Sequence, residues 1–442
     1  MIEIENKDCK IFTDNIEPEA LEQIYGVLKI PENEGLKVRI MPDVHGGKGI
    51  CIGFTSTVGD YINPDYIGVD IGCSVSLALV NKPIQDLELF EHRLKGAIPM
   101  GPDIHTSRQF QVKEFLAFLR TELQRAYQAT GGLIFLPDFN SESDLERWCR
   151  EVGIDLATFY KSIGTLGRGN HYIEYDCGTD EKGNLIYGIS VHTGSRNLGL
   201  KVNKYWTKEA EGTKVSKEVQ KEIAKKVREY PGIEKKDIKR KIDLALDLWK
   251  RQNLHPGFLS GENLRGYLTD VCIASAYAKW NHKIILDKAL EIYTKITSTE
   301  YYSGPGKEIR RITTQHNYID FTSPVPIIRK GSVSAKEGEI FLLPFNMRDG
   351  IAVCKGKGNA DWNYSSPHGS GRKMSRNAAK SKINLKDYEK SMTGIYSTTV
   401  CRETIDESPM AYKDTSEILS LIEPTAEVLY TLKPKMNIKS TK

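Results

Sequence analysis

The sequence contains no pair of cysteines at the close spacing of a disulfide framework or a zinc ribbon. Its eight cysteines are scattered singly through 442 residues, which is typical of a reducing compartment, where a lone cysteine packs in the core or binds a metal. The chain also lacks an apolar run long enough to span a bilayer, and its N-terminus lacks the charged-then-apolar pattern of a signal peptide. We therefore expect a soluble protein of the cytoplasm that does not contact a membrane.

The chain has little net charge, since 62 lysines and arginines against 58 acidic residues give +4. Nucleic-acid binding would need a local basic patch, because the overall field is weak. No internal repeat, linker or low-complexity segment divides the chain. We expect residues 1–442 to form a single domain of large size and ordinary globular composition.

Hydrophobic periodicity predicts a mixture of helices and strands, and therefore an α+β fold. Strands are expected at residues 36–41, 50–58, 66–71, 187–192, 339–344 and 350–355. Helices are expected at 18–28, within 85–130 and 141–163, and over 262–296, with a mixed α/β segment over 386–435.

One stretch, Ser365–Arg376, places His368 between a proline and a Gly-Ser-Gly turn that is followed by three basic residues. The glycines let the backbone approach a ligand closely, and successive N–H groups in such a turn can bind an anion. An imidazole in this position can accept a phosphoryl or nucleotidyl group, because it is a competent nucleophile near neutral pH. The alternative is a surface loop whose histidine has no chemical role.

Five further residues of metal-ligand type lie at expected strand ends or glycine turns: Asp70, Cys73, His171, His192 and His316. Three imidazoles, a carboxylate and a thiolate suit a pair of divalent metals such as Mn²⁺ or Zn²⁺, with the thiolate as a bridge. Two adjacent metals stabilise the attacking and leaving oxygens in displacement at phosphorus. The alternative is that Cys73 is a core residue and Asp70 caps the next element, because free cysteines are often buried. Spacing alone does not decide whether the five residues converge.

Seven motifs occur in the order in which they are found in the RtcB family of RNA ligases. They are Met41-Pro-Asp-Val-His, Gly68-Val-Asp-Ile-Gly-Cys, Gly169-Asn-His-Tyr-Ile-Glu, His192-Thr-Gly-Ser-Arg, His316-Asn-Tyr, Arg329-Lys-Gly and His368-Gly-Ser-Gly-Arg. The chain resembles this family from about residue 35 to residue 440, except in a charged segment at 200–255. The resemblance implies a fold of mixed β-sheets surrounded by helices around a central metal-binding cleft.

The resemblance also implies a GTP- and manganese-dependent ligase that joins RNA 2′,3′-cyclic phosphate or 3′-phosphate ends to 5′-hydroxyl ends, in RNA repair or tRNA splicing. It implies that Cys73, His171 and His192 bind one Mn²⁺ and that Asp70, Cys73 and His316 bind the second. His368 is then the nucleophile that takes GMP from GTP, and the guanylate passes to an RNA 3′-phosphate before the 5′-hydroxyl displaces GMP. The implied partners are GTP and RNA, and an activating protein is left open.

Matching motif positions imply roles for residues around this centre. Glu174 is suited to accept hydrogen bonds from guanine N1–H and N2–H₂, a pattern that adenine lacks. Nucleotide contacts are expected from four more residues: Asn170, Asn346, Tyr412 and Lys439. Asp43 is expected to support the metal shell or the RNA end. Lys330 and Arg372 are expected to bind phosphates.

Two departures from the family pattern concern the nucleotide pocket. Residues 344–350 read Pro-Phe-Asn-Met-Arg-Asp-Gly where many members have Pro-Gly-Ser-Met-Gly, so Asn346 replaces a serine contact and Arg348 adds a charge near phosphate. Arg168 stands where a glycine is usual, in the turn before His171. These changes leave the metal ligands intact, bear on nucleotide and substrate choice, and favour a divergent branch of the family.

Residues 200–255 are dense in lysine and glutamate, with apolar residues at helical intervals. This segment is interpreted as a charged helical insertion exposed to solvent, and the alternative is an additional contact surface for an RNA backbone.

Two other functions stay open for the whole chain. One is a metallophosphoesterase that opens cyclic phosphates without ligating them, which needs neither His368 nor Glu174. The other is an RNA-binding protein that has kept the fold without catalysis, which does not need Cys73.

Overall fold

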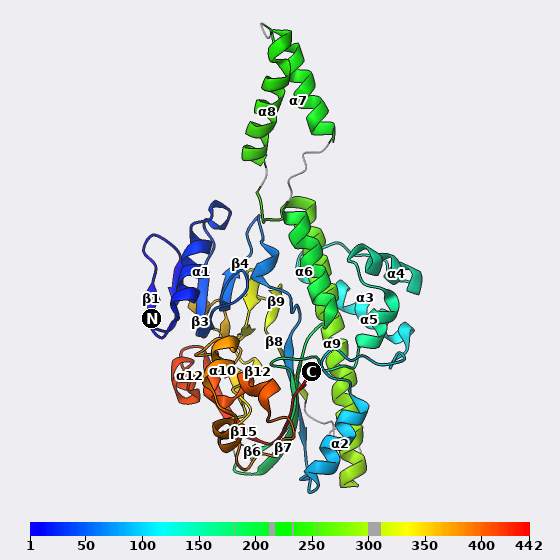
Figure 1. Cartoon of the computed structure of the whole chain (residues 1–442), viewed down its shortest axis with the longest axis vertical. Coiled ribbons are helices and arrows are strands. Elements are labelled where there is room, and N and C mark those ends of the chain that lie inside the picture. Colours follow the sequence, from blue (N-terminus) through cyan, green and yellow to red (C-terminus); the bar gives the residue numbers. More distant parts are fainter. Residues whose placement is uncertain (181, 212–216, 232–233, 254, 299–310) are drawn as a thin grey trace.

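The computed structural model describes residues 1–180, 182–211, 217–231, 234–253, 255–298 and 311–442 (Figure 1). The fold of these residues is α+β, with a six-stranded sheet, a seven-stranded sheet and a two-stranded ribbon. The six-stranded sheet has the order β1 (Ile2–Glu3), β2 (Cys9–Ile11), β3 (Val38–His45), β4 (Ile52–Thr57), β10 (Ile327–Lys330) and β9 (Asn317–Asp320). The ribbon pairs β11 (Ser332–Ser334) with β14 (Ser365–Pro367).

The seven-stranded sheet carries most of the candidate site. Its order is β12 (Ile340–Pro344), β13 (Ile351–Gly356), β15 (Ala426–Ile438), β6 (Tyr172–Thr179), β7 (Leu185–Thr193), β5 (Ser74–Val80) and β8 (Arg311–Gln315). This sheet curls until its two edge strands, β12 and β8, approach each other. A hydrogen bond joins them, from the backbone N–H of Leu342 in β12 to Thr314 Oγ1 in β8, at 2.9 Å. Val75 and Leu77 of β5 therefore share one core with Leu432 of β15, across the inside of the curl.

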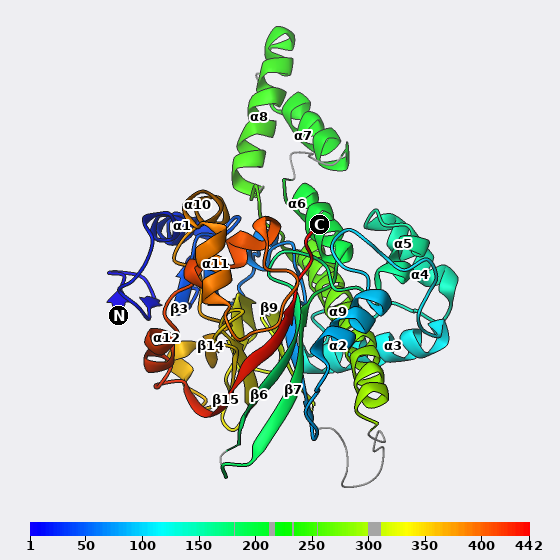
Figure 2. The same ribbon diagram turned by 60° about the horizontal axis from the view of Figure 1, so that its bottom comes forward.

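A single long helix, α9 (Gly261–Thr297), supports the outside of this sheet. Ile285 and Ala289 of α9 pack with Ile189 and Val191 of β7 in a second core. The other helices of the body are α1 (Pro18–Leu28), α2 (Leu87–Ala97), α3 (Val112–Ala129), α4 (Glu142–Glu151), α5 (Leu156–Ser162), α6 (Asn197–Ala210), α10 (Arg376–Lys382), α11 (Leu385–Ser391) and α12 (Thr415–Leu421). Helices α3, α4 and α5 lie beyond α9, away from the sheets (Figures 1 and 2). No helix in the described part of the chain combines the length and apolar character needed to cross a membrane.

The strand expected at 66–71 is wrong. The chain there leaves a short 3₁₀ turn, η2 (Pro64–Tyr66), and runs through an irregular loop until β5 begins at Ser74. Gly68 and Gly72 have φ values of 86° and 80°, in the left-handed region that a strand does not use. The apolar run Ile-Gly-Val-Asp-Ile is therefore a buried loop, and this loop delivers Asp70 and Cys73 to the sheet edge.

Part of the charged segment 200–255 leaves the body of the protein. Helix α6 lies at its start but belongs to the core, where Val202 and Trp206 are buried. Helices α7 (Lys217–Glu229) and α8 (Ile238–Asn253) instead form a hairpin that projects well beyond the sheets and the other helices (Figures 1 and 2). We call residues 217–253 the arm. Its base is closed by a hydrogen bond from the Gly257 N–H to the Ala210 carbonyl oxygen, at 2.9 Å.

Asn281 of α9 connects two segments that carry candidate ligands. Its Oδ1 accepts from the backbone N–H groups of Gly164 and Thr165, in the turn that leads to His171. Its Nδ2 lies within donating distance of Thr193 Oγ1 and the Gly194 carbonyl oxygen, directly after His192. The side chain is completely buried, so it holds both segments in place without competition from water.

Replacing Asn281 with alanine should destabilise the protein strongly. The substitution Asn281→Ala leaves buried N–H and C=O groups unpaired, and we expect the free energy of unfolding to fall by about 2–4 kcal/mol. Urea unfolding followed by circular dichroism measures this change. Lys279→Ala, at an exposed position on the same helix, is the control and should change the free energy by less than about 0.5 kcal/mol. Equal effects of the two substitutions would contradict the role assigned to Asn281.

Candidate metal centre and adjoining cavity

The pairing of four strands brings the expected ligands to one end of the curled sheet. Cys73 immediately precedes β5, His192 lies near the end of β7, and His316 immediately follows β8. In the antiparallel register Ser74 pairs with both Thr193 and Gln315, and Tyr172 pairs with His192. Residues at the starts of β5 and β6 therefore face residues at the ends of β7 and β8. Four positions spread over almost 250 residues of sequence become neighbours.

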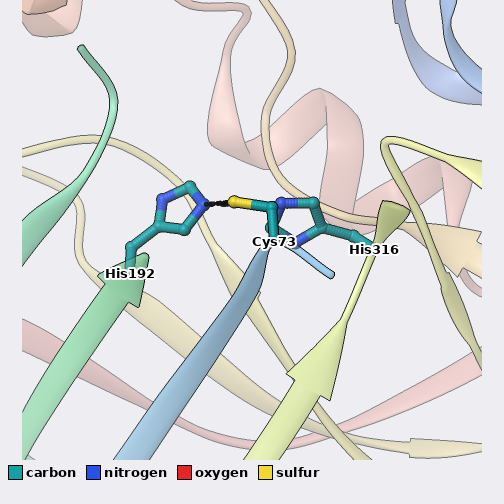
Figure 3. A group of neighbouring side chains, drawn as sticks. All are labelled: Cys73, His192 and His316. Carbon is teal, nitrogen blue, oxygen red and sulfur yellow. Dashed lines mark hydrogen bonds between the residues drawn. The ribbon is translucent and has the colours of Figure 1, made fainter. Parts of the chain in front are cut away.

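The ligand atoms are close enough to share metal ions. Cys73 Sγ lies 3.2 Å from His192 Nε2 and 3.5 Å from His171 Nε2. His192 Nε2 lies 3.4 Å from His316 Nε2, and Asp70 Oδ2 lies 3.2 Å from His171 Nε2. Figure 3 shows the Cys73 sulfur between the rings of His192 and His316. The five residues thus form one continuous cluster with Cys73 at its centre.

The cluster divides into two groups of three, each with its ligand atoms within 4.8 Å of one another. One group is Cys73, His192 and His316, and the other is Asp70, Cys73 and His171. Cys73 is common to both, as a bridging thiolate requires. The expected assignment placed His171 with His192 and His316 with Asp70, so the two groups differ from it by an exchange of His171 and His316. Which histidine binds which ion stays a prediction.

The surroundings of the cluster prepare its atoms for metal binding. His171 Nδ1 lies 2.9 Å from the Leu166 carbonyl oxygen, which can only accept a hydrogen bond, so Nδ1 carries the proton and Nε2 presents its lone pair to the cluster. Burial lowers the pKa values of His192 and His316, which keeps both imidazoles neutral. Burial and the nearby Asp70 raise the pKa of the Cys73 thiol. A bound cation is therefore needed to keep Cys73 as a thiolate, and the donor set fits a borderline divalent metal.

His368 lies next to the cluster and is oriented by a buried carboxylate. Its ring Nδ1 lies 2.6 Å from Asp43 Oδ2, and its backbone N–H donates to the same oxygen at 3.2 Å. An ionised carboxylate only accepts, so His368 Nδ1 carries the proton and Nε2 is left with a free lone pair. The ring centroids of His368 and His316 are 4.9 Å apart. Gly371 allows this arrangement, because a β-carbon there would lie 2.2 Å from the Asp43 carbonyl oxygen.

A cavity of about 610 Å³ opens in front of His368 and the cluster. This volume is typical of sites for small molecules and nucleotides. Its lining includes ligand residues of the cluster and these residues expected to contact nucleotide or phosphate: Asn170, Glu174, Asn346, Arg372, Tyr412 and Lys439. The structure thus brings most of the expected site residues to the lining of one cavity.

Lys330 and Asp43 occupy other places than expected. Lys330 is buried behind the cavity, where its ammonium donates to the backbone carbonyl oxygens of Lys48 and Asp65. Burial lowers its pKa to about 8. Its position does not support the expected phosphate contact, because its hydrogen bonds hold the 48–65 segment. Asp43 contacts His368 directly, whereas it was expected to support the metal shell or the RNA end.

The departures in the 344–350 loop also have a structural explanation. Asn346 Oδ1 accepts from the backbone N–H groups of Arg348 and Asp349, which closes a tight turn. The Arg348 guanidinium pairs with Asp349 at 2.8 Å and is absent from the cavity lining, so the expected charge near phosphate is already neutralised. Asn346 therefore shapes the loop and also lines the cavity.

Glu174 is buried in the cavity wall near a second carboxyl group, that of Asp176. Asn437 Nδ2 donates to Glu174 Oε1. Burial and the neighbouring Asp176 together raise the pKa of Glu174. A ligand that donates hydrogen bonds would favour the ionised form of this carboxyl.

Sequence reasoning missed Glu407, which organises the far wall of the cavity. Glu407 is only 2% exposed, and it accepts a hydrogen bond from Tyr412 OH at 2.7 Å. Lys439 Nζ lies 3.3 Å and Arg372 Nη1 3.4 Å from its carboxylate oxygens. Burial favours the protonated acid, but the cations Lys439, Arg376 and Arg372 lower its pKa to about 2. The only signal in the sequence was its position five residues before Tyr412.

A cluster of metal-ligand side chains beside an oriented imidazole, at the mouth of a nucleotide-sized cavity, is the arrangement of a metal-dependent enzyme. The protein family described as tRNA-splicing ligase RtcB matches residues 23–440 of the chain. The RNA-splicing ligase RtcB of Escherichia coli K12 is 27% identical over 99% of both chains. The tRNA-splicing ligase RtcB of Archaeoglobus fulgidus is 26% identical over 92% of this chain and 88% of its own. The chain therefore belongs to the RtcB family of RNA-splicing ligases.

Removing the central thiol should remove metal binding. For Cys73→Ala we expect metal content after equilibration with Mn²⁺ and gel filtration to fall from about two ions per chain to less than one, because both groups share this ligand. Inductively coupled plasma mass spectrometry measures the content. Cys354→Ala, at another buried free cysteine, is the control and should leave the metal content unchanged. Full metal content in Cys73→Ala would contradict a thiolate-bridged centre.

Glu407 should make stability depend on pH in a definite direction. Its folded pKa of about 2 lies below its ordinary value of 4.5, so its stabilising contribution is present above pH 4.5 and is lost as the pH falls toward 2. Wild-type protein should exceed Glu407→Gln in unfolding free energy by about 3 kcal/mol at pH 7, and the gap should narrow as the pH is lowered to 3. Urea unfolding at pH 7, 5, 4 and 3 measures the difference. Glu389→Gln, at an exposed site in α11, should show no such gap, and a constant gap for Glu407→Gln would refute the assignment.

Proposed function

We propose that the protein is a GTP- and Mn²⁺-dependent RNA ligase that joins RNA 3′-phosphate or 2′,3′-cyclic phosphate ends to 5′-hydroxyl ends through a guanylated His368. The observation that carries this proposal is the position of His368. Its Nε2 is freed by the hydrogen bond from Nδ1–H to Asp43, and its ring lies beside the cysteine and histidine cluster at one cavity.

His368 is suited to attack the α-phosphorus of GTP. The bond that forms joins Nε2 to phosphorus, and the bond that breaks connects phosphorus to the bridging oxygen, so pyrophosphate leaves. As the imidazole gains positive charge, Asp43 stabilises the cation that forms, because its carboxylate is buried and already holds Nδ1–H. The P–N bond is labile, so the guanylate stays transferable to an RNA 3′-phosphate.

The metal cluster is suited to bind the phosphate groups of GTP and of the RNA 3′ end. Asp70, Cys73, His171, His192 and His316 would hold two Mn²⁺ ions, which offset the negative charge that builds up when one phosphate approaches another. Arg372 lines the same cavity, where Glu407 offsets part of its positive charge.

The cavity offers a matching surface for a guanine nucleotide. A deprotonated Glu174 accepts from N1–H and N2–H₂ of guanine, which would distinguish it from adenine. Tyr412 and Lys439 are held in the wall by Glu407, so a base can stack on the tyrosine ring and bond to the ammonium at little entropic cost. Asn170 completes this wall, and its carbonyl oxygen accepts from Lys439 at 3.1 Å.

The second half of the reaction would use the same centre. The guanylate moves to the RNA 3′-phosphate, and the 5′-hydroxyl of the other RNA end then attacks that phosphate and displaces GMP. A 2′,3′-cyclic end must first be opened by water to a 3′-phosphate.

The proposal is tested by following label from GTP. Incubation with α-labelled GTP and Mn²⁺ should leave covalently bound GMP on wild-type protein and none on His368→Ala, a loss of at least about 1,000-fold, because the nucleophile itself is removed. Denaturing gels with autoradiography measure the label. His92→Ala, at an exposed histidine of α2, is the control and should be labelled as wild type is.

The same reaction with an RNA pair that carries 3′-phosphate and 5′-hydroxyl ends separates ligation from hydrolysis. Wild-type protein should produce RNA of the summed length, whereas His368→Ala should not. Opening of cyclic phosphates by His368→Ala at the wild-type rate, with no ligated product from either protein, would favour the metallophosphoesterase and contradict the ligase.

A further inference from the structure

The arm carries an excess of positive charge. Residues 217–253 contain twelve lysines and arginines and seven acidic residues, which is a net charge of +5. The whole chain has a net charge of only +4, so the remaining residues sum to −1. A body whose charges nearly balance thus bears a basic projection, and this projection supplies a local basic patch of the kind that nucleic-acid binding requires.

The basic side chains of the arm are exposed and ordered along its helices. Lys221, Lys225 and Arg228 of α7 recur at intervals of four and three residues, so they lie on one face of the helix and are all exposed. They cover about 10 Å along the helix axis, a length that spans two or three phosphates of an RNA strand. Lys239, Arg240 and Lys241 at the start of α8 are exposed as well.

Some cations of the arm are neutralised within it. Lys226 pairs with Glu222 at 2.8 Å and Lys236 with Glu234 at 2.7 Å, and Lys225 lies at 4.0 Å from Glu229. In the part of the chain that the structure describes, no ion pair is found for Lys221, Arg228 or the three cations at 239–241. Their charge is available to an external anion, because a solvated lysine or arginine loses little when it exchanges water for phosphate.

The end of the arm adds an aromatic surface to this charge. Tyr230 directly follows α7 and is 69% exposed, two residues from Arg228. An exposed aromatic ring beside cations is the arrangement on which unpaired nucleotide bases stack. The exposed Leu244 and Leu248 of α8 lie one helical turn apart on the same face, and two side chains form a much smaller apolar surface than a stable protein interface needs.

We propose that the arm is an RNA-binding element that contacts the phosphate backbone of the substrate away from its reacting ends. This proposal rests on the proposed function, which makes RNA the substrate. The arm would increase the affinity for the RNA by binding it away from the ends, whereas the chemistry takes place at the His368 cavity. A charge surface of this kind does not depend on base sequence, so it selects structured or long RNA over short oligonucleotides.

Charge-removing substitutions in α7 test the proposal. In Lys221→Ala/Lys225→Ala/Arg228→Ala, alanine preserves helix propensity while three cations are lost. We expect binding of a stem-loop RNA with a 3′-phosphate to weaken about tenfold near 0.1 M salt, and the slope of log affinity against log salt to decrease by about 2. Fluorescence anisotropy at several salt concentrations measures both. Affinity for an oligonucleotide of a few residues should stay unchanged, since it reaches only the cavity.

The matched control is Glu218→Ala/Glu222→Ala/Glu229→Ala, which changes the same helix at the same number of positions with the opposite change of charge. RNA binding by this variant should stay the same or become stronger. Equal weakening by both variants would show that only the integrity of the helix matters and would overturn the proposal. Unchanged affinity and salt slope in the cation variant would also overturn it.

Covalent labelling with α-labelled GTP separates this proposal from the proposed function. Labelling involves no RNA, so the cation variant should be labelled as wild type is. If wild-type protein is not labelled, the ligase proposal fails, while the comparison of RNA affinities between the two variants still decides the role of the arm.

Discussion

The antiparallel pairing of β6, β7, β5 and β8 is the constraint on which the site depends. Each of these strands starts or ends at a candidate ligand, and the register aligns those ends within one residue of each other. A shift of β5 by one residue would turn Cys73 to the other face of the sheet, since side chains alternate. The curl of the sheet and the packing of α9 fix this register, so the chemistry of the centre rests on core packing far from it.

A second constraint is electrostatic, because buried charged side chains must be paired. The site gathers anionic and cationic side chains in a buried volume, where an unpaired charge is expensive. Glu407 pairs with the cations Lys439 and Arg372, and it accepts a hydrogen bond from Tyr412 at the same time. Asp43 likewise holds the His368 ring by a hydrogen bond. Each group that faces the cavity is thereby held by a partner behind it, so a ligand meets side chains that are already in place.

The membership of the cluster could be predicted from the sequence, but the contacts within and around it could not. Asp70, Cys73, His171, His192, His316 and His368 were found because each lies in a short motif of distinctive residue types. Glu407 was missed because its partners lie up to 35 residues away and no local pattern records a buried ion pair. Lys330 illustrates a related point, since residue type indicates that a lysine can bind phosphate but not that its ammonium donates to two backbone carbonyl oxygens. The 66–71 loop resembled a strand because its apolar residues are buried, and only its two left-handed glycines distinguish it.

The hydrogen bond between Gly257 and Ala210 has a consequence for how such a protein can change over time. It joins the two points where the chain leaves the body of the protein and returns to it, so the base of the arm is closed. Neither residue of this contact lines the cavity, so the length and charge of the intervening helices can change without moving the cluster residues. The appendage and the cavity can therefore diverge independently.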